Sequence, residues 1–291
     1  MINTEKVYKK IIGIGGVIII GLLLSIFITL FLNSLPTIKK FGFKFLINKT
    51  WDPVFENFGA LPFIIGTILT SIISLIISVP FSLSLSLFIG EYYRDTFISK
   101  VFETFIEIIA VIPSVIFGLW GLFYLAPIIR SLQLKFSLPP TGVSIFTASL
   151  ILSIMIIPYA TSIGKEVIKL VPIDLKEAAF SFGATRYEVV KKIIFPYARS
   201  GIFAGFLLSF GRAIGETMAV TMVIGNSNFL TFNILKSGNT IASIIANEFT
   251  EAVETLHLTS LIELGLILFL ITFIINFFAH FFVIKRKIIE I

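Results

Sequence analysis

The chain has 291 residues, of which 56% are apolar and 14% are charged, and its mean hydropathy is +1.01. A soluble domain carries about 25% charged residues, so this composition excludes an ordinary soluble globular protein. The net charge of +6 does not indicate nucleic-acid binding, because the basic residues flank apolar runs rather than gathering on one face. The absence of cysteine excludes a disulfide framework, a thiolate metal site and a cysteine nucleophile.

Six long apolar runs are the main structural signal. A membrane-spanning helix needs about 20 mainly apolar residues, and these runs are far longer than the roughly 10-residue alternating strands of a barrel. Only helices and closed barrels satisfy the backbone hydrogen bonds inside a bilayer. We therefore predict an all-α membrane protein with six transmembrane helices, at about 11–32, 61–89, 102–126, 141–163, 199–224 and 258–283.

The basic residues predict the orientation of these helices. With the N-terminus inside, 15 of the 23 Lys and Arg residues lie in cytoplasmic segments, seven lie in outer segments and Arg212 lies within a span. Because cytoplasmic loops are enriched in Lys and Arg, we expect both termini in the cytoplasm. The first run is about twice as long as the apolar part of a signal peptide and no A-x-A site follows it, so we expect it to stay uncleaved.

Three features outside the motifs have structural interpretations. The outer segment 33–60 is either a connector with Trp51 at the lipid headgroups or a lid over an entrance. His257 and His280 have no histidine partner nearby, so we expect interfacial side chains and no metal site. In the second span four hydroxyls share one helical face and either pack helices together or line a polar path; they belong to Thr67, Ser71, Ser74 and Ser78.

The third span carries Pro113 within its apolar run IPSVIFGLWG. Proline removes a helical hydrogen bond, so we expect a kink or a broken helix there. Such a break either presents backbone N–H groups and Ser114 to an anion or is filled by neighbouring side chains. Pro158 in the fourth span leaves the same two alternatives.

The largest polar segment between spans, 164–199, predicts two short amphipathic helices. Pro172 and Asp174 favour a helix start, Gly183 ends that helix, and a second stretch runs to Pro196. Two such helices lying across the membrane face form a knob that another protein can grip.

This segment resembles the EAA motif of ABC importer permeases, which reads E-A-A, three residues, G, nine residues and I-x-L-P. The matching residues are Glu177, Ala178, Ala179, Gly183, Ile193 and Pro196, with Phe195 at the Leu position as the one departure. The resemblance implies the type I ABC importer permease fold. It also implies that about 172–190 is a coupling helix seated in an ATPase subunit, where small alanines allow close approach. An amphipathic loop lying on anionic lipid is the alternative.

The chain has no G-x-x-x-x-G-K-[ST] phosphate loop. We therefore expect a transport subunit that is not itself an enzyme and binds no cofactor, with ATP and Mg used by a separate ATPase. A membrane enzyme is disfavoured because the spans hold no histidine cluster, carboxylate pair or nucleophile constellation.

In the fifth span, GRAIGETMAV places Arg212 and Glu216 four residues apart. On a continuous helix this spacing puts the two on one turn. They form either a self-neutralising structural pair or a substrate site, in which the guanidinium holds an oxyanion through forked hydrogen bonds and Glu216 positions it. Our predicted substrate-binding residues are Arg212, Glu216, Ser114 and Thr217.

The runs IPSVIFGLWG, ATRYEVVKKIIFPYARSGI, GRAIGETMAV and IGN resemble the C-type permease subunits of bacterial high-affinity phosphate ABC importers, over about 60–285. The sister A-type family has a proline soon after GET, where this chain has Met218, Ala219 and Val220. The resemblance implies inorganic phosphate as substrate in the bacterial inner membrane. The implied partners are a sister A-type permease subunit, an ATPase dimer, an extracytoplasmic phosphate-binding protein and membrane lipid. The alternatives are a permease for sulfate, molybdate or tungstate, and an ATPase-independent channel or scaffold.

The outer segment TIASIIANEFTEAVE, 240–254, predicts an amphipathic helix with Glu248, Glu251 and Glu254 on neighbouring turns. It either docks the binding protein or lies on the membrane. We divide the chain into an N-terminal helix with its extracytoplasmic segment, 1–60, a transport domain, 61–285, with the coupling loop at about 164–199, and a cytoplasmic tail, 286–291.

Overall fold

A computed structural model describes residues 4–137 and 139–287, and this part of the chain is built from helices and loops, with one isolated β-bridge between Asp52 and Asn57. Six of its helices are long and apolar enough to cross a membrane. This confirms the predicted all-α membrane protein with six spans, but the third span runs over Ser114–Lys135 rather than 102–126, because the chain breaks at Pro113. Residues 288–291 of the predicted tail lie outside the described residues, and the side chain of His280 lies outside the described side chains.

The elements follow one another along the chain, with η denoting a π-helix. They are α1 (Thr4–Phe41), α2 (Lys44–Ile47), α3 (Leu61–Leu87), η1 (Phe88–Tyr92), α4 (Phe97–Val111), α5 (Ser114–Trp120), η2 (Gly121–Leu125), α6 (Ala126–Lys135), α7 (Ile145–Lys169), α8 (Ile173–Ser181), α9 (Arg186–Val189), η3 (Val190–Ile194), α10 (Phe195–Gly215), α11 (Met218–Val223), α12 (Ile241–Glu248) and α13 (Thr255–Lys287).

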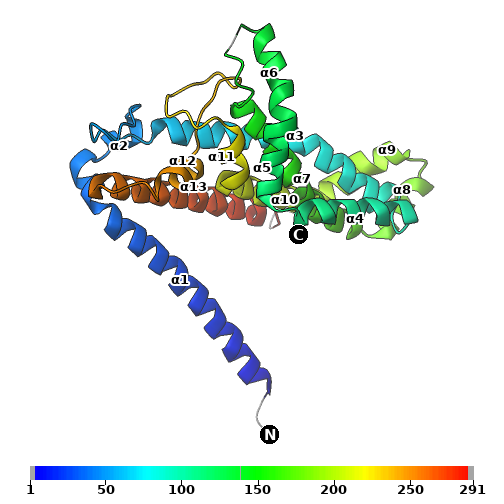
Figure 1. Cartoon of the computed structure of the whole chain (residues 1–291). Helices are drawn as coiled ribbons and strands as arrows, with labels where there is room; N and C mark the ends of the chain where they lie inside the picture. The colour runs from blue at the N-terminus through cyan, green and yellow to red at the C-terminus, as the bar shows by residue number, and fades with distance from the viewer. Residues whose placement is uncertain (1–3, 138, 288–291) are drawn as a thin grey trace.

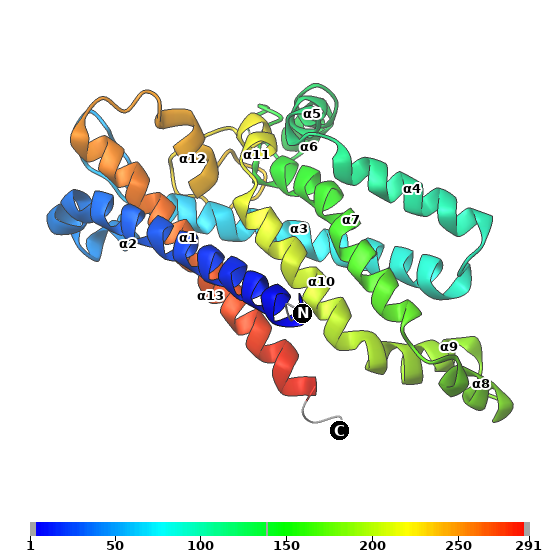
Figure 2. The same cartoon turned by 90° about the horizontal axis from the view of Figure 1, so that it is seen from below.

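Helix α7 is the central element, and α3 and α10 pack along it. Helix α13 packs against α10 and α12, and α1 lies against α13 before diverging from the bundle toward its N-terminus (Figure 1). Helices α8 and α9 lie at one end of the molecule, while α2 and α12 lie toward the other (Figure 2). We call these the α8–α9 end and the α2–α12 end.

The hydroxyl face of α3 is completely buried within this chain. Thr67, Ser71, Ser74 and Ser78 are at most 1% exposed, and the Ser74 and Ser78 hydroxyls donate to carbonyls of their own helix. Further along, the Ser86 side chain lies so close to Gly164 of α7 that a Cβ on Gly164 would collide with it. The small hydroxyl residues therefore let α3 and α7 approach closely, and of the two predicted alternatives the structure supports packing.

The prolines of the spans have different effects. Helix α4 ends at Val111 and α5 begins at Ser114, so the break predicted at Pro113 is confirmed. Pro36 and Pro158 lie inside α1 and α7 without ending them. As a result α1 continues to Phe41, and the connector between the first two spans is shorter than predicted.

Candidate functional site

Two breaks between helices lie close together in the fold. Helix α5 starts at Ser114 after one break, and α11 starts at Met218 after a second break at Glu216 and Thr217. The two short helices pack side by side, since a Cβ on Gly118 would lie 3.2 Å from Ala219 Cα. Ser114 begins α5 and Thr217 directly precedes α11, and both side chains are half-buried.

Arg212 and Glu216 are not arranged as the helical spacing predicts. Helix α10 ends at Gly215, and Glu216 has extended backbone with φ −70° and ψ 125°. The pair therefore does not share a helical turn, and among the described residues no ion pair joins the two side chains. Instead, Glu216 Oε1 accepts the backbone N–H of Ala219 at 3.4 Å, which satisfies an otherwise unpaired donor in the first turn of α11.

The Arg212 side chain is exposed and lies over an aromatic ring. Its Cζ is 4.5 Å from the centroid of Tyr159, one residue after Pro158 in α7. A guanidinium at this distance is attracted by the negative face of the ring while its N–H groups stay available to another partner. Local spacing carries no signal for this contact, because Tyr159 is 53 positions away from Arg212.

A polar network that our sequence reasoning missed continues beyond α11. Thr221 Oγ1 donates to Ser243 Oγ at 3.1 Å, and Ser243 Oγ donates to Asn226 Oδ1 at 3.0 Å. Asn226 Nδ2 donates to the Thr221 carbonyl at 3.0 Å. These bonds fasten α11 to α12. The IGN run contains Asn226, but nothing in its spacing identifies the other two residues as its partners.

The predicted coupling residues lie together at the α8–α9 end. Glu177 and Ala178 are exposed on α8, and Ala179 is half-buried against a core formed by α7, α9 and α10. Gly183 ends the turn after α8 with φ +83°, a conformation that side chains with a Cβ rarely adopt. The first predicted helix and its glycine stop are thus confirmed.

The second predicted helix of this loop was assigned the wrong end. A capping box of Thr185 and Glu188 starts α9, but the helix then runs through η3 into α10 without stopping at Pro196. Proline lacks a backbone donor, and the π-helical turn just before it changes the hydrogen-bond register there. The loop therefore continues directly into the fifth span.

The structure of the α2–α12 end differs from the interfacial setting expected for His257, from one of the two alternatives for Trp51 and from the length expected for the acidic helix. Trp51 and His257 are buried, at 7% and 8% exposure, and are not interfacial side chains. Glu248 Oε2 lies 2.8 Å from His257 Nε2 and accepts Trp51 Nε1–H at 2.9 Å. Helix α12 ends at Glu248, so Glu251 and Glu254 do not continue an acidic helical face. The Glu248 carboxylate thus joins α12 to the segment that holds Trp51 and to the start of α13, which holds His257. These segments are separate in the sequence, so local patterns do not relate them.

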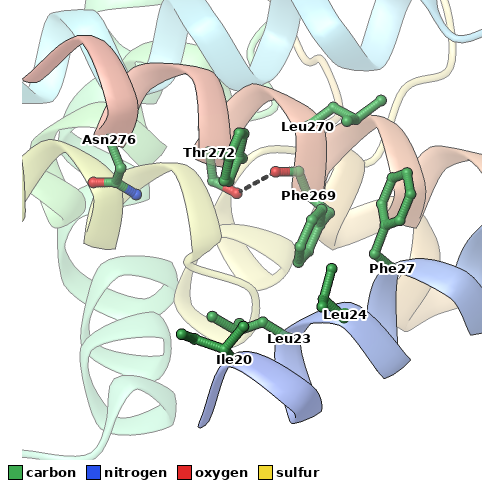
Figure 3. Close-up of a pocket in the computed structure, with 9 residues that line it drawn as sticks. Ile20, Leu23, Leu24, Phe27, Phe269, Leu270, Thr272 and Asn276 are labelled. Atoms are coloured by element: carbon green, nitrogen blue, oxygen red, sulfur yellow. Dashed lines mark hydrogen bonds between the residues drawn. The ribbon is translucent and has the colours of Figure 1, made fainter. Parts of the chain in front are cut away.

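A groove of about 650 Å³ separates α1 from α13 (Figure 3). Its lining is apolar, with Leu23, Leu24 and Phe27 facing Phe269, and contains Thr272 and Asn276 as its polar side chains. None of the predicted substrate-binding residues lines it. A groove of this composition suits hydrocarbon rather than an anion.

Comparisons with known proteins agree with this architecture. Residues 82–287 match the family of binding-protein-dependent transport system inner membrane components. The chain is 40% identical to the phosphate transport system permease protein PstC of Mesorhizobium japonicum, over 91% of this chain and 86% of that protein. It is 41% identical to the PstC of Haemophilus influenzae, over 91% and 88%, and 35% identical to the probable PstC of Methanocaldococcus jannaschii, over 89% and 88%.

Among solved structures, a chain of the MetNI methionine ABC transporter in an inward-facing conformation aligns with a TM-score of 0.58 and 16% identity. The alignment covers 81% of this chain and 99% of that one, and at this identity it shows the fold alone. With the family match over 82–287 and relatives at 34–41% identity, the chain belongs to the binding-protein-dependent transport system inner membrane components, the permeases of ABC importers.

Proposed function

We propose that this chain is the C-type permease subunit of an ATP-driven importer and that it forms, with a sister A-type subunit, the pathway for inorganic phosphate. The observation that carries this proposal is the 40% identity, over 91% of the chain, to a permease of a phosphate transport system. Residues 61–285 form the transport domain in this proposal. The α8–α9 end and both termini face the cytoplasm, and a phosphate-binding protein docks outside.

Arg212 is the proposed phosphate contact. Its exposed guanidinium beside Tyr159 supports this role, because forked N–H groups match the oxygens of a tetrahedral anion. Ser114 and Thr217 supply hydroxyls at the starts of α5 and α11. Glu216 caps α11 and accepts a hydrogen bond from an anion that still carries a proton.

Uptake of radiolabelled phosphate into proteoliposomes holding this chain, its sister, the ATPase and the binding protein tests the proposal. We expect ATP-dependent uptake that excess sulfate, molybdate or tungstate does not suppress. Arg212→Ala lowers this uptake at least about tenfold, the loss expected for a charge-assisted hydrogen bond, while Arg130→Ala in α6 leaves it unchanged. Normal phosphate uptake by Arg212→Ala would remove the site, and preferential uptake of another oxyanion would change the substrate.

The ATPase partnership has its own test. Glu177 is exposed on α8, and we expect Glu177→Lys to reduce the ATPase that co-purifies with the permease. Unchanged co-purification would favour an ATPase-independent channel or scaffold.

A further inference from the structure

Helix α8 carries one deeply buried cation. Most of its side chains are exposed, including Ile173 at 59% and Leu175 at 47%, whereas Lys176 is 4% exposed. Lys176 Nζ donates to Glu91 Oε2 at 2.5 Å, and the Glu91 side chain is 13% exposed. A lysine is rarely buried this deeply unless it is paired, so Lys176 depends on Glu91 for its place in the folded protein.

Glu91 belongs to η1, the π-helix that connects α3 to the turn before α4. A second contact reaches the same place from α9, where Arg186 Cζ lies 5.4 Å from the centroid of the Tyr92 ring. Both helices of the coupling loop therefore touch η1 at adjacent residues. π-helical turns are rare and are found mostly as single turns at functional sites, and η1 stands between α3 and α4, where it can act as a joint between them.

Helix α4 links this joint to the predicted substrate site. Its 15 residues make a rod of about 22 Å, and its far end, Val111, is followed by the break at Pro113 and by Ser114. Lys165 and Lys169 of α7 hold the middle of the rod at Glu103, at 3.1 Å and 3.0 Å. A displacement of α8 thus has a continuous route through Lys176, η1 and α4 to Ser114.

We propose that Lys176 and Glu91 are coupling residues, which transmit the movement of α8 through η1 and α4 to the break at Ser114. This inference rests on the proposed function as an ATP-driven permease. The residues act by position, since neither lies at the predicted substrate site nor on the exposed face of α8. Breaking the pair separates ATP hydrolysis from transport, and keeping a charge on each side preserves the link.

The test measures phosphate transported per ATP hydrolysed by the complete transporter in proteoliposomes. The double variant Lys176→Met/Glu91→Gln removes both charges and leaves neither buried alone. We expect it to assemble with the ATPase and hydrolyse ATP while this ratio falls at least about fivefold, the lower range of a coupling between sites. The charge exchange Lys176→Glu/Glu91→Lys recovers part of the ratio. The control is Lys192→Met, which removes an exposed i, i+4 pair with Glu188 from the same loop and leaves the ratio unchanged.

A neutral double variant with the wild-type ratio overturns the inference. A neutral double variant that no longer assembles also overturns it, because the pair then has only a structural role. Failure of the proposed function is separate: in that case the wild-type transporter itself shows no ATP-dependent phosphate uptake.

Discussion

At the scale of single residues, Arg212 depends on a ring from another span rather than on the acidic residue four positions away. Tyr159 lies under its guanidinium at 4.5 Å. A cation–π contact at a partly exposed site contributes about 0.5–2 kcal/mol. The ring limits the positions of Arg212 without occupying the N–H groups that we propose contact phosphate.

The residue-scale prediction is that Tyr159→Leu raises the apparent KM for phosphate about three- to tenfold, from the free energy of the lost cation–π contact. Tyr159→Phe keeps the ring and is the matched control, with an expected KM near that of the unmodified chain. Initial uptake rates over a range of phosphate concentrations measure both values. Equal KM values for the Leu and Phe variants would show that the ring does not position Arg212.

Glu103 gives a prediction about pH. Burial raises the pKa of its carboxyl, but the hydrogen bonds and charges of Lys169 and Lys165 outweigh this effect and hold the pKa below its ordinary value of 4.5. The stabilisation from this cluster is therefore fully present above pH 4.5 and is lost as the pH falls through the lowered pKa. We expect Glu103→Gln to lower the free energy of unfolding by about 1 kcal/mol near pH 7.

Thermal unfolding of the purified chain in detergent, followed from pH 7 to pH 3, checks this prediction. The difference between Glu103→Gln and the unmodified chain stays constant down to about the ordinary carboxyl pKa and shrinks below it. Glu107→Gln on the same helix is the control. A difference that grows on acidification would mean that the lysines do not stabilise the ionised carboxylate.

At the scale of elements, the bundle depends on close approach between α3 and α7. Gly164 faces Ser86 with no room for a Cβ, whereas Gly21 of α1 has nothing within 4 Å of that position. We expect Gly164→Leu to destabilise the fold by about 1–3 kcal/mol or more, because the added side chain forces the two helices apart. Gly21→Leu changes an exposed helix face and has little effect. Unfolding midpoints in detergent compare the two, and equal midpoints would contradict the packing.

Elements whose formation is a local property could be predicted from the sequence. The six spans, the break at Pro113 and the glycine stop at Gly183 each follow from hydrophobicity or backbone geometry within a few residues. The break after Gly215 carries no proline, so helical spacing placed Arg212 and Glu216 on one turn. Trp51 and His257 were misplaced because Glu248, which buries both, is 197 and 9 positions away from them.

At the scale of the whole molecule, each end of the bundle exposes a phenylalanine side chain to its surroundings. Phe182 follows α8 and is 93% exposed, and Phe55 lies between α2 and α3 at the opposite end and is 81% exposed. Figure 1 shows α8 and α2 far apart along the bundle. If the α8–α9 end docks the ATPase, only the aromatic at that end is covered when the transporter assembles.

The whole-molecule prediction uses these two residues as a matched pair. Phe182→Asp places a charge in the proposed interface, where an apolar side chain gains about 1.5–3 kcal/mol on burial, so we expect at least about tenfold less ATPase to co-purify. Phe55→Asp makes the same chemical change at the other end and leaves the ATPase bound. Both substitutions alter exposed positions, so the permease itself folds in either case, which its elution profile verifies. Equal loss of ATPase from both variants would point to a general effect on the membrane bundle, whereas full retention by Phe182→Asp would place the ATPase contact elsewhere than the α8–α9 end.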